Sequence, residues 1–151
     1  MTKEELKIKI TEILSTAIID ESSEWINVSV EANEFRSFME QIRSDKDLDL
    51  DYLFCLTCVD WKTHLTTVYH LSSTTTRHCI VVKVKLDRNN PEVETICDIW
   101  RTAELHEREV FEMFGVKFLH HPDLRLLILP DDFIGFPLRK DFEDPINMIK
   151  L

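Results

Sequence analysis

Glycine is scarce in this sequence of 151 residues, in which Gly115 and Gly135 are the two present. Nucleotide-binding loops such as Gly-x-Gly-x-x-Gly and the Walker loop need several glycines, because the backbone must approach phosphate groups closely. The sequence therefore lacks a nucleotide-binding loop of either kind.

Long apolar runs and an excess of basic residues are also absent. No stretch reaches the roughly 18 to 20 apolar residues of a membrane-spanning helix, and the N-terminus lacks the apolar core of a signal peptide. We therefore expect a soluble, intracellular protein. The formal net charge is -10, with 18 Lys and Arg against 28 Asp and Glu. Nucleic acid is not an expected partner, because binding phosphate requires a basic surface.

Cysteine offers no metal-binding pattern. Cys55 and Cys58 form a C-x-x-C, but they lie within residues 52–59, which have the composition of a strand. Three residues of strand separate their Cα atoms by about 10 Å, beyond the roughly 7 Å reach of a disulfide, and direct the side chains to opposite faces. Cys79 and Cys97 add no second close pair. We expect all four to be buried structural thiols.

Hydrophobic periodicity predicts an α/β fold of the α+β type, with helices packed on a mixed sheet that contains a mainly antiparallel meander. Thr2 and Glu5 form a capping box for the first helix. The strand at residues 52–59 is apolar on both faces, so we expect it in the centre of the sheet. The expected helices cover residues 3–16, 35–42 and 99–114, and the expected strands cover 25–30, 52–59, 65–71 and 78–86.

Residues 119–151, called the tail below, hold four of the five prolines and show little periodicity. Long irregular segments in compact domains usually serve a function. The tail is also too apolar to be freely solvated, so it needs a surface to pack on. We therefore expect an α/β domain over residues 1–118 and an extended tail over 119–151 that packs on a partner.

The helix expected at residues 99–114 has one apolar arc, and Glu107 falls inside it. A buried carboxylate is costly unless it is paired. Glu107 therefore predicts a cationic or multi-donor partner, for which Arg125 and Arg139 are the candidates. Gly115 stands where a left-handed residue would end the helix.

The opposite face of this helix offers two ion pairs at i,i+4 spacing, Glu104 with Arg108 and Arg108 with Glu112. We expect both pairs to be exposed and to contribute little to stability. Thr95 or Asp98 is expected to cap the start of the helix.

Catalytic patterns on this helix are incomplete. His106 and Glu107 begin like the zinc motif H-E-x-x-H, but Val110 occupies the second histidine position. A di-iron carboxylate site would need matching motifs on other helices. A metal hydrolase that uses His106, Glu107 and Glu109 stays as a remote alternative. The main expectation is that these charges are structural or lie at an interface.

These segments resemble a known family, that of the 30-kilodalton subunit (the C subunit) of respiratory complex I. The resemblance is specific over about 40 residues of the C-terminal part and extends upstream over most of the chain beyond the N-terminal helix. The matching segments are Glu107–Val116 (EREVFEMFGV), His121–Arg125 (HPDLR), Leu129–Phe133 (LPDDF), Pro137–Phe142 (PLRKDF), Leu56–Trp61 (LTCVDW) and Val68–Leu71 (VYHL).

The resemblance implies a cofactor-free structural subunit in the peripheral arm of a proton-translocating NADH:quinone oxidoreductase. Other subunits of that complex hold FMN, iron–sulfur clusters and quinone. The tail would pack on the quinone-site subunit, the 49-kilodalton (D) subunit, near cluster-bearing neighbours. The complex would place this chain on the cytoplasmic side of the bacterial inner membrane, attached to the membrane only through its partners.

The resemblance also implies that this chain has no catalytic, cofactor-binding or metal-binding residue. Phe133 stands where the family often has tryptophan. The residues with an implied structural or interface role are Glu107, Arg108, Glu109, Gly115, His121, Arg125, Phe133, Arg139 and Lys140.

Two further alternatives stay open beside the remote metal hydrolase. The first is the homologous subunit of an energy-converting hydrogenase or of a ferredoxin- or F420-linked dehydrogenase. The second is an adaptor that belongs to no redox complex.

Overall fold

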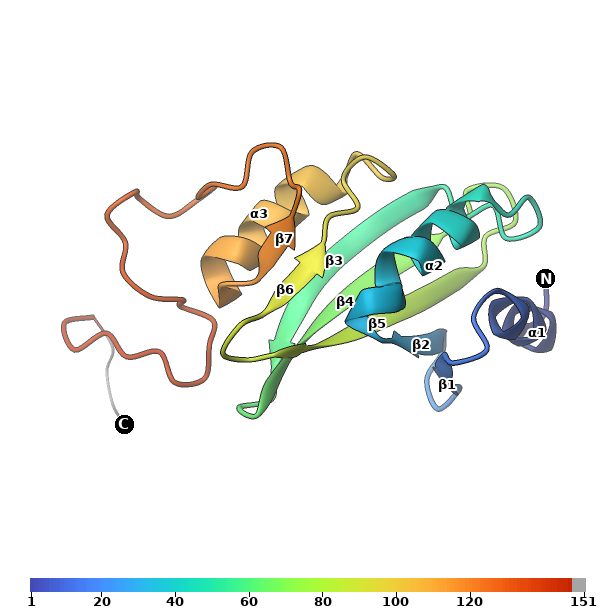
Figure 1. Cartoon of the computed structure of the whole chain (residues 1–151), viewed down its shortest axis with the longest axis horizontal. Coiled ribbons are helices and arrows are strands. Elements are labelled where there is room, and N and C mark those ends of the chain that lie inside the picture. Colours follow the sequence, from blue (N-terminus) through green and yellow to red (C-terminus); the bar gives the residue numbers. More distant parts are fainter. Residues whose placement is uncertain (148–151) are drawn as a thin grey trace.

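The fold is built on one five-stranded mixed sheet, shown in Figure 1 as part of a computed structural model that describes residues 1–147. The strand order is β1-β2-β5-β4-β3, with β2 and β5 parallel and the other neighbouring pairs antiparallel. The three strands of this sheet that come last in the sequence therefore form the expected meander. The five strands are β1 (Ile18–Asp20), β2 (Ile26–Val30), β3 (Tyr52–Asp60), β4 (His64–Ser72) and β5 (Cys79–Asp87).

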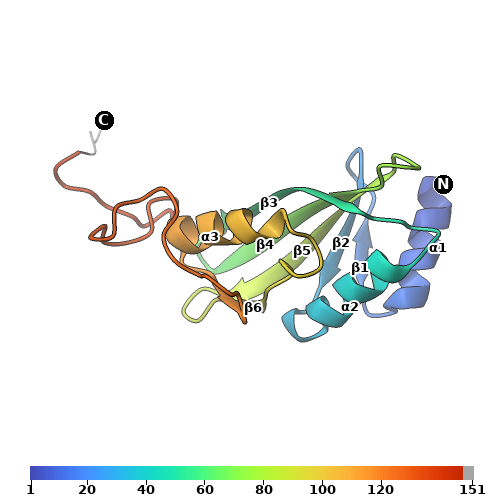
Figure 2. The ribbon, with the colours of Figure 1, turned by 90° about the horizontal axis from the view of Figure 1, so that it is seen from above.

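Helices and a small second sheet complete the domain. The helices are α1 (Lys3–Ile13), α2 (Ala32–Ser44) and α3 (Ala103–Phe114), and the second sheet pairs β6 (Glu92–Glu94) with β7 (Lys117–Leu119) in parallel. α2 packs against β5, and α3 lies alongside β3. α1 lies at the end of the domain away from the tail (Figures 1 and 2). This arrangement confirms the expected α/β fold class.

The first two helices follow the sequence signals. The Thr2–Glu5 capping box is present, although α1 ends at Ile13, earlier than expected, because Leu14 is already extended. Residues 18–20, which no pattern singled out, form β1 against β2. In α2, the four predicted apolar positions are at most 1% exposed, so this amphipathic face forms the core; they are Phe35, Phe38, Met39 and Ile42.

The expectation that β3 lies in the centre of the sheet was wrong, because β3 is an edge strand. One face of β3 is buried in the core. On the other face, the Phe54 ring lies 5.9 Å from Trp25 and 5.6 Å from His70, measured between ring centroids. This aromatic group accounts for the apolar residues on the second face. The Thr102 hydroxyl donates to Leu53 O at 2.8 Å, so the segment that leads into α3 occupies part of the free edge.

The C-x-x-C lies in β3 as expected, with no disulfide. Cys55 pairs in register with His70 and Cys58 with Thr67, an odd offset that directs the two side chains to opposite faces. Burial raises the pKa of the Cys58 thiol to about 12. The expectation that all four thiols are buried was wrong for Cys55, Cys79 and Cys97, which are half-buried.

The tail begins with the last residue of β7 and forms turns and bends over residues 120–147. It extends from the end of the domain next to α3 (Figure 1). Within residues 1–147, none of the helices is long and apolar enough to cross a bilayer.

Candidate functional site

Helix α3 ends at Gly115, as predicted, and the same residue brings the tail close to the helix. Gly115 has a φ of 75°, in the left-handed region that glycine tolerates, and its N–H donates to Phe111 O at 2.8 Å. A Cβ at this position would lie 2.6 Å from the Phe136 ring. Glycine is therefore required both by the helix end and by the packing of the tail.

Glu112 of α3 holds the tail through its backbone. Its carboxylate accepts the N–H groups of Leu127, Ile128 and Leu129, at 2.8 Å, 3.0 Å and 3.1 Å. Glu112 is 1% exposed. Burial alone would raise the pKa of this carboxyl, but the three amide donors together lower it below its usual value. Glu112 is therefore an ionised carboxylate that binds three consecutive amides.

Arg108 lies one turn before Glu112 and holds the preceding part of the tail. Its guanidinium donates to Arg125 O at 3.1 Å and to Leu126 O at 2.8 Å, and it lies 3.8 Å from the Asp123 carboxylate. Arg108 and Glu112, called the clamp below, thus bind the carbonyl and amide groups of residues 125–129. The expectation that they form an exposed ion pair was wrong, because the tail covers this face of α3.

A second set of contacts fixes the tail further along. Arg139 Nε donates to Phe114 O at 2.6 Å, and Leu138 N donates to Met113 O at 3.1 Å. The Arg139 guanidinium also lies over the Phe136 ring, 4.7 Å from its centroid. The last turn of α3 therefore binds residues 137–141 (the PLRKD segment) through main-chain carbonyls that have no partner within the helix.

Asp60, at the end of β3, is the other anchor of this segment. Its carboxylate accepts the N–H groups of Lys140, at 2.8 Å, and Lys62, at 2.7 Å, and pairs with Arg88. Arg88 also pairs with Asp141 at 2.7 Å. Burial alone would raise the pKa of Asp60, but these donors together lower it. The PLRKD segment is thus bound by its own domain through both main chain and side chains.

Glu107 is buried, as the helix wheel predicted, but its partner is not an arginine. It is 0% exposed, accepts the Ile96 N–H at 2.8 Å, and accepts a hydrogen bond from the Thr95 hydroxyl. Burial outweighs these donors and raises the pKa of Glu107 to about 7. The multi-donor partner is confirmed, whereas the choice of Arg125 or Arg139 was wrong.

The prediction that Thr95 or Asp98 caps the start of α3 was also wrong. Thr95 binds Glu107, and Asp98 forms a bidentate pair with Arg36 at 2.6 Å and 2.7 Å. The helix starts after Thr102 without a side-chain cap.

His121 fixes the start of the tail beside Glu107. Its buried ring accepts the Asp123 N–H at Nδ1, at 3.0 Å, which leaves Nε2 to donate to Glu104 O, also at 3.0 Å. Nε2 also lies 3.8 Å from a Glu107 carboxylate oxygen. Both ring nitrogens therefore have partners within the protein.

Cys97, Glu107 and His121 place one possible metal-ligand atom each within 4.8 Å of one another. The donor chemistry does not suit a metal, because Glu107 already accepts hydrogen bonds at both oxygens and His121 Nε2 carries the ring proton. We interpret the set as a hydrogen-bond network that joins α3, the segment after β6 and the tail.

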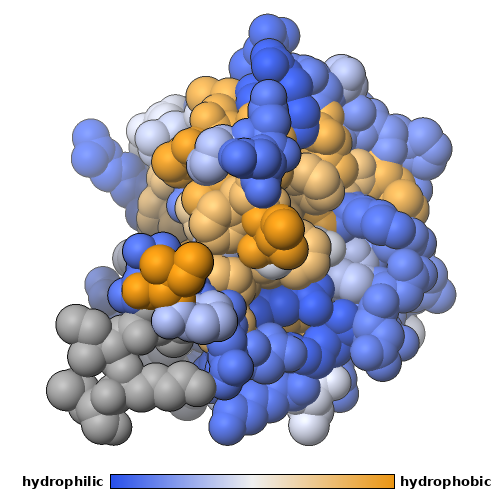
Figure 3. All heavy atoms as spheres, turned by 90° about the vertical axis from the view of Figure 1, so that its left-hand side faces the viewer, coloured by the Kyte–Doolittle hydropathy of each residue, from blue (hydrophilic) through white to orange (hydrophobic). Residues whose placement is uncertain are grey.

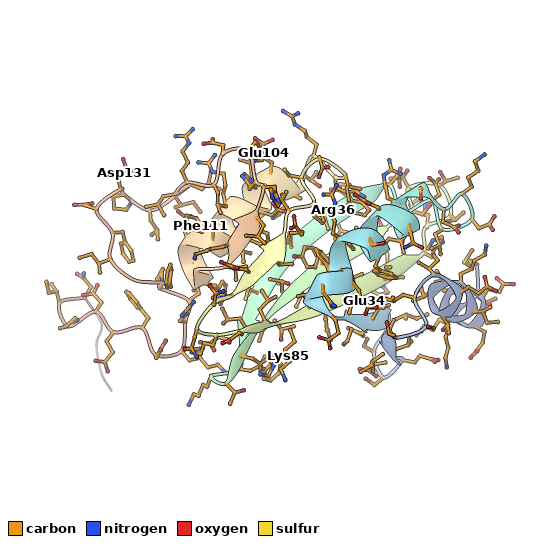
Figure 4. All side chains as sticks on the ribbon, in the orientation of Figure 1. Glu34, Arg36, Lys85, Glu104, Phe111 and Asp131 are labelled. Atoms are coloured by element: carbon orange, nitrogen blue, oxygen red, sulfur yellow. The ribbon has the colours of Figure 1, made fainter. Side chains whose placement is uncertain are left out.

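A cavity of about 550 Å³ adjoins this network, with Arg36 of α2 and Glu104 of α3 in its wall (Figure 4). Both arginines in its wall are already paired, Arg36 with Asp98 and Glu40 and Arg101 with Glu104. The residues of the remote hydrolase alternative are not brought together, because Glu107 faces the core whereas Glu109 is exposed.

The tail displays apolar side chains outward while its backbone is held. Figure 3, which faces the tail end, shows apolar residues gathered on this side. Asp131 marks the part of the tail that lies far from the sheet (Figure 4). Phe133 stacks on Phe142, with centroids 6.0 Å apart. The most exposed large apolar residues of the described tail are Ile128 at 67%, Ile134 at 89%, Leu138 at 54% and Ile146 at 91%.

The residues with an expected structural or interface role fall into two groups. Those that hold the tail or the network are Glu107, Arg108, Gly115, His121 and Arg139, and those whose side chains reach the surface at least in part are Glu109, Arg125, Phe133 and Lys140. Sequence reasoning missed Asp60, Arg88 and Glu112 as contributors. Asp60 and Glu112 lie in segments that carry the family resemblance, and this resemblance could have pointed to their role.

The chain matches known proteins along most of its length. Residues 28–146 match the family model described as "Respiratory-chain NADH dehydrogenase, 30 Kd subunit". The C subunit of NADH-quinone oxidoreductase from Moorella thermoacetica is 42% identical, over 75% of this chain and 76% of the relative. The combined C/D subunit of NADH-quinone oxidoreductase from Phocaeicola vulgatus is 40% identical, over 82% of this chain but only 24% of that longer protein. The C subunit of the F(420)H(2) dehydrogenase of Methanosarcina mazei is 35% identical, over 93% and 89%.

Two solved structures have a similar fold. A trypsin-resistant fragment of Nqo5 superposes with a TM-score of 0.70 at 23% identity, over 82% of this chain and all of the fragment. A chain of the membrane-bound sulfane sulfur reductase, an archaeal respiratory membrane complex, superposes with a TM-score of 0.76 at 27% identity, over 93% and 85%. On this evidence, the chain belongs to the family of the 30-kilodalton subunit of respiratory-chain NADH dehydrogenase.

Proposed function

We propose that this chain is a structural subunit of the peripheral arm of an NADH:quinone oxidoreductase, and that its tail docks on the 49-kilodalton subunit, which holds the quinone site. The observation that carries the proposal is a tail whose backbone is bound by α3 while Ile128, Ile134 and Leu138 point outward. The Phocaeicola relative supports the choice of partner, since its name joins the C and D subunits in one chain.

In this proposal the chain supports electron transfer from NADH to quinone without taking part in it. FMN, iron–sulfur clusters and quinone would be held by other subunits, some of them neighbours of this chain. The complex would hold the chain on the cytoplasmic side of the bacterial inner membrane. The purified chain is expected to be colourless and to show no NADH dehydrogenase activity.

Co-purification of the 49-kilodalton subunit with this chain tests the docking proposal. Ile134→Asp and Ile128→Asp place a charge on the exposed tail surface and should leave the unfolding temperature unchanged. We expect each variant to recover at least tenfold less of the 49-kilodalton subunit from cells that express the whole complex. Ile8→Asp is the matched control, because Ile8 is 57% exposed on α1, away from the tail. Normal recovery of the partner by both tail variants would refute the proposal.

The homologous subunit of an F420-linked or related respiratory complex is the second candidate. The nearly full coverage of both chains in the Methanosarcina match favours it. The electron donor separates the two candidates. The purified complex should oxidise NADH under the main proposal, and reduced F420 or ferredoxin under the second. An adaptor outside any redox complex would co-purify with no cluster-bearing subunit.

A further inference from the structure

The sheet carries a hollow of about 400 Å³ that lies apart from the clamp. Its lining comes from the five strands of the large sheet and from residues next to them, among them Thr16 before β1 and Glu31, the N-cap of α2. Register places its central residues side by side, with Val59 opposite Thr66, Thr66 opposite Lys85 and Val68 opposite Lys83. The hollow is therefore a surface of the sheet itself.

Two lysines of β5 face this hollow, and their neighbours on the adjacent strands are neutral. Across the sheet, Lys83 is flanked by Ser29 and Val68, and Lys85 by Thr66. Within residues 1–147, neither lysine has a carboxylate oxygen within 4.0 Å, although Glu31 lies in the wall. In a chain with a net charge of -10, the two lysines form a local positive pair on β5 (Figure 4 labels Lys85), and the charge of Lys83 helps to lower the pKa of Asp20 on β1.

Exposed apolar side chains surround the two lysines. Ile18 is 71% exposed, Trp61 is 56% exposed and Val59 is 37% exposed. The Trp61 ring stacks on His64, with centroids 6.3 Å apart. A segment that fits this surface would carry carboxylates, to pair with the lysines, and apolar side chains to cover the rim.

The hollow is continuous with the tail. Lys140 Nζ lies 6.0 Å from the centroid of the Trp61 ring, and the Lys140 backbone is fixed by Asp60, the residue that precedes Trp61. A partner that docks on the tail therefore reaches the rim of the hollow without crossing other parts of the domain.

We propose that the hollow receives an extended segment of the same partner that docks on the tail, a segment in which carboxylates alternate with apolar side chains. This inference rests on the proposed function, because it takes the 49-kilodalton subunit as the partner. The lysines would give the contact its specificity through charge, and Trp61 would anchor its edge.

Zero-length crosslinking of the wild-type complex tests the charge contact. A carbodiimide joins an amine to a carboxylate only when the two groups are in contact. We expect mass spectrometry to find an isopeptide bond between Lys83 or Lys85 and an Asp or Glu of the 49-kilodalton subunit. A bond to a different subunit, or none from either lysine, would overturn the inference.

Photocrosslinking separates this inference from the docking of the tail. Benzoylphenylalanine is placed in the complex at Trp61, at Ile134 and, as a control for random collision, at Ile8. We expect the probes at Trp61 and Ile134 to capture the 49-kilodalton subunit. The double variant Lys83→Glu with Lys85→Glu should reduce capture by the Trp61 probe at least tenfold and leave capture by the Ile134 probe unchanged. Capture from Ile134 with none from Trp61 above the Ile8 control would refute this inference alone. Absence of capture by the Ile134 probe in the complex without the lysine substitutions would refute the proposed function.

Discussion

The backbone N–H of Lys140 donates to the carboxylate of Asp60 at 2.8 Å, across 80 positions of the chain. The same carboxylate binds Arg88 and the turn after β3. One buried acid therefore holds together the end of the sheet, the segment after β5 and the tail.

Replacing Asp60 by asparagine should destabilise the protein. The change removes the charge that faces Arg88 and weakens the acceptor for Lys140, so we expect a loss on the order of 2 kcal/mol in the free energy of unfolding. Urea unfolding at pH 7 measures it. Asp132→Asn, at an exposed position of the tail, is the control and should have almost no effect.

The Asp60 contribution should also depend on pH. The folded state lowers the pKa of this group below its ordinary 3.8. Its stabilisation is therefore present above pH 3.8 and is lost as the pH falls through the lower folded-state pKa. Between about pH 5 and pH 3, the wild type should lose stability more steeply than Asp60→Asn. Parallel curves for the two proteins would contradict this account.

Replacing Glu112 by glutamine should loosen the tail without unfolding the domain. Glutamine offers one carbonyl oxygen in place of two carboxylate oxygens to the amides of residues 127–129. We expect hydrogen exchange at those amides to become about tenfold faster. Glu109→Gln, on the exposed face of the same helix, should leave the exchange unchanged. Equal exchange in both variants would show that the clamp does not order the tail.

Gly115→Ala should destabilise the junction between α3 and the tail. The left-handed backbone costs an alanine about 1 to 2 kcal/mol, and the new Cβ would also meet the Phe136 ring. The double variant Gly115→Ala with Phe136→Ala, compared with Phe136→Ala alone, separates the two costs in a double-mutant cycle. We expect Gly115→Ala to cost less in the Phe136→Ala background. An identical cost in both backgrounds would exclude the contact with the ring.

Glu107→Gln should remove a pH dependence of stability near neutrality. The pKa of Glu107 is raised from 4.5 to about 7 in the folded protein. Its contribution is therefore full below pH 4.5 and is lost as the pH rises through 7. We expect the wild type to lose about 3 kcal/mol relative to the glutamine variant between pH 4.5 and pH 8. Thermal unfolding across this range measures the difference, with Glu109→Gln as the control.

Periodicity predicted the helices and the four long strands because each has one apolar face that the core buries. It gave the wrong position in the sheet for β3, because aromatic residues on the second face of this edge strand imitate the pattern of a central strand. It also missed β1, because three residues are too few to show a period. The family resemblance, by contrast, identified the family from a few charged and proline positions.

The clamp could not be predicted from the sequence. Arg108 and Glu112 have the spacing of a surface ion pair, and nothing in a helix wheel shows that an aperiodic segment covers them. The partners of Glu107 were hidden for a related reason, since a backbone N–H such as that of Ile96 leaves no mark in the sequence. Contacts from side chain to backbone over a distance therefore appear only in the fold.

Because the clamp binds main-chain groups, the course of residues 125–129 does not depend on which side chains they carry. Substitutions there can follow those of a partner through evolution while the tail keeps its path. We expect relatives with different partners to differ in the apolar residues at these positions and to retain the arginine and the acid on α3.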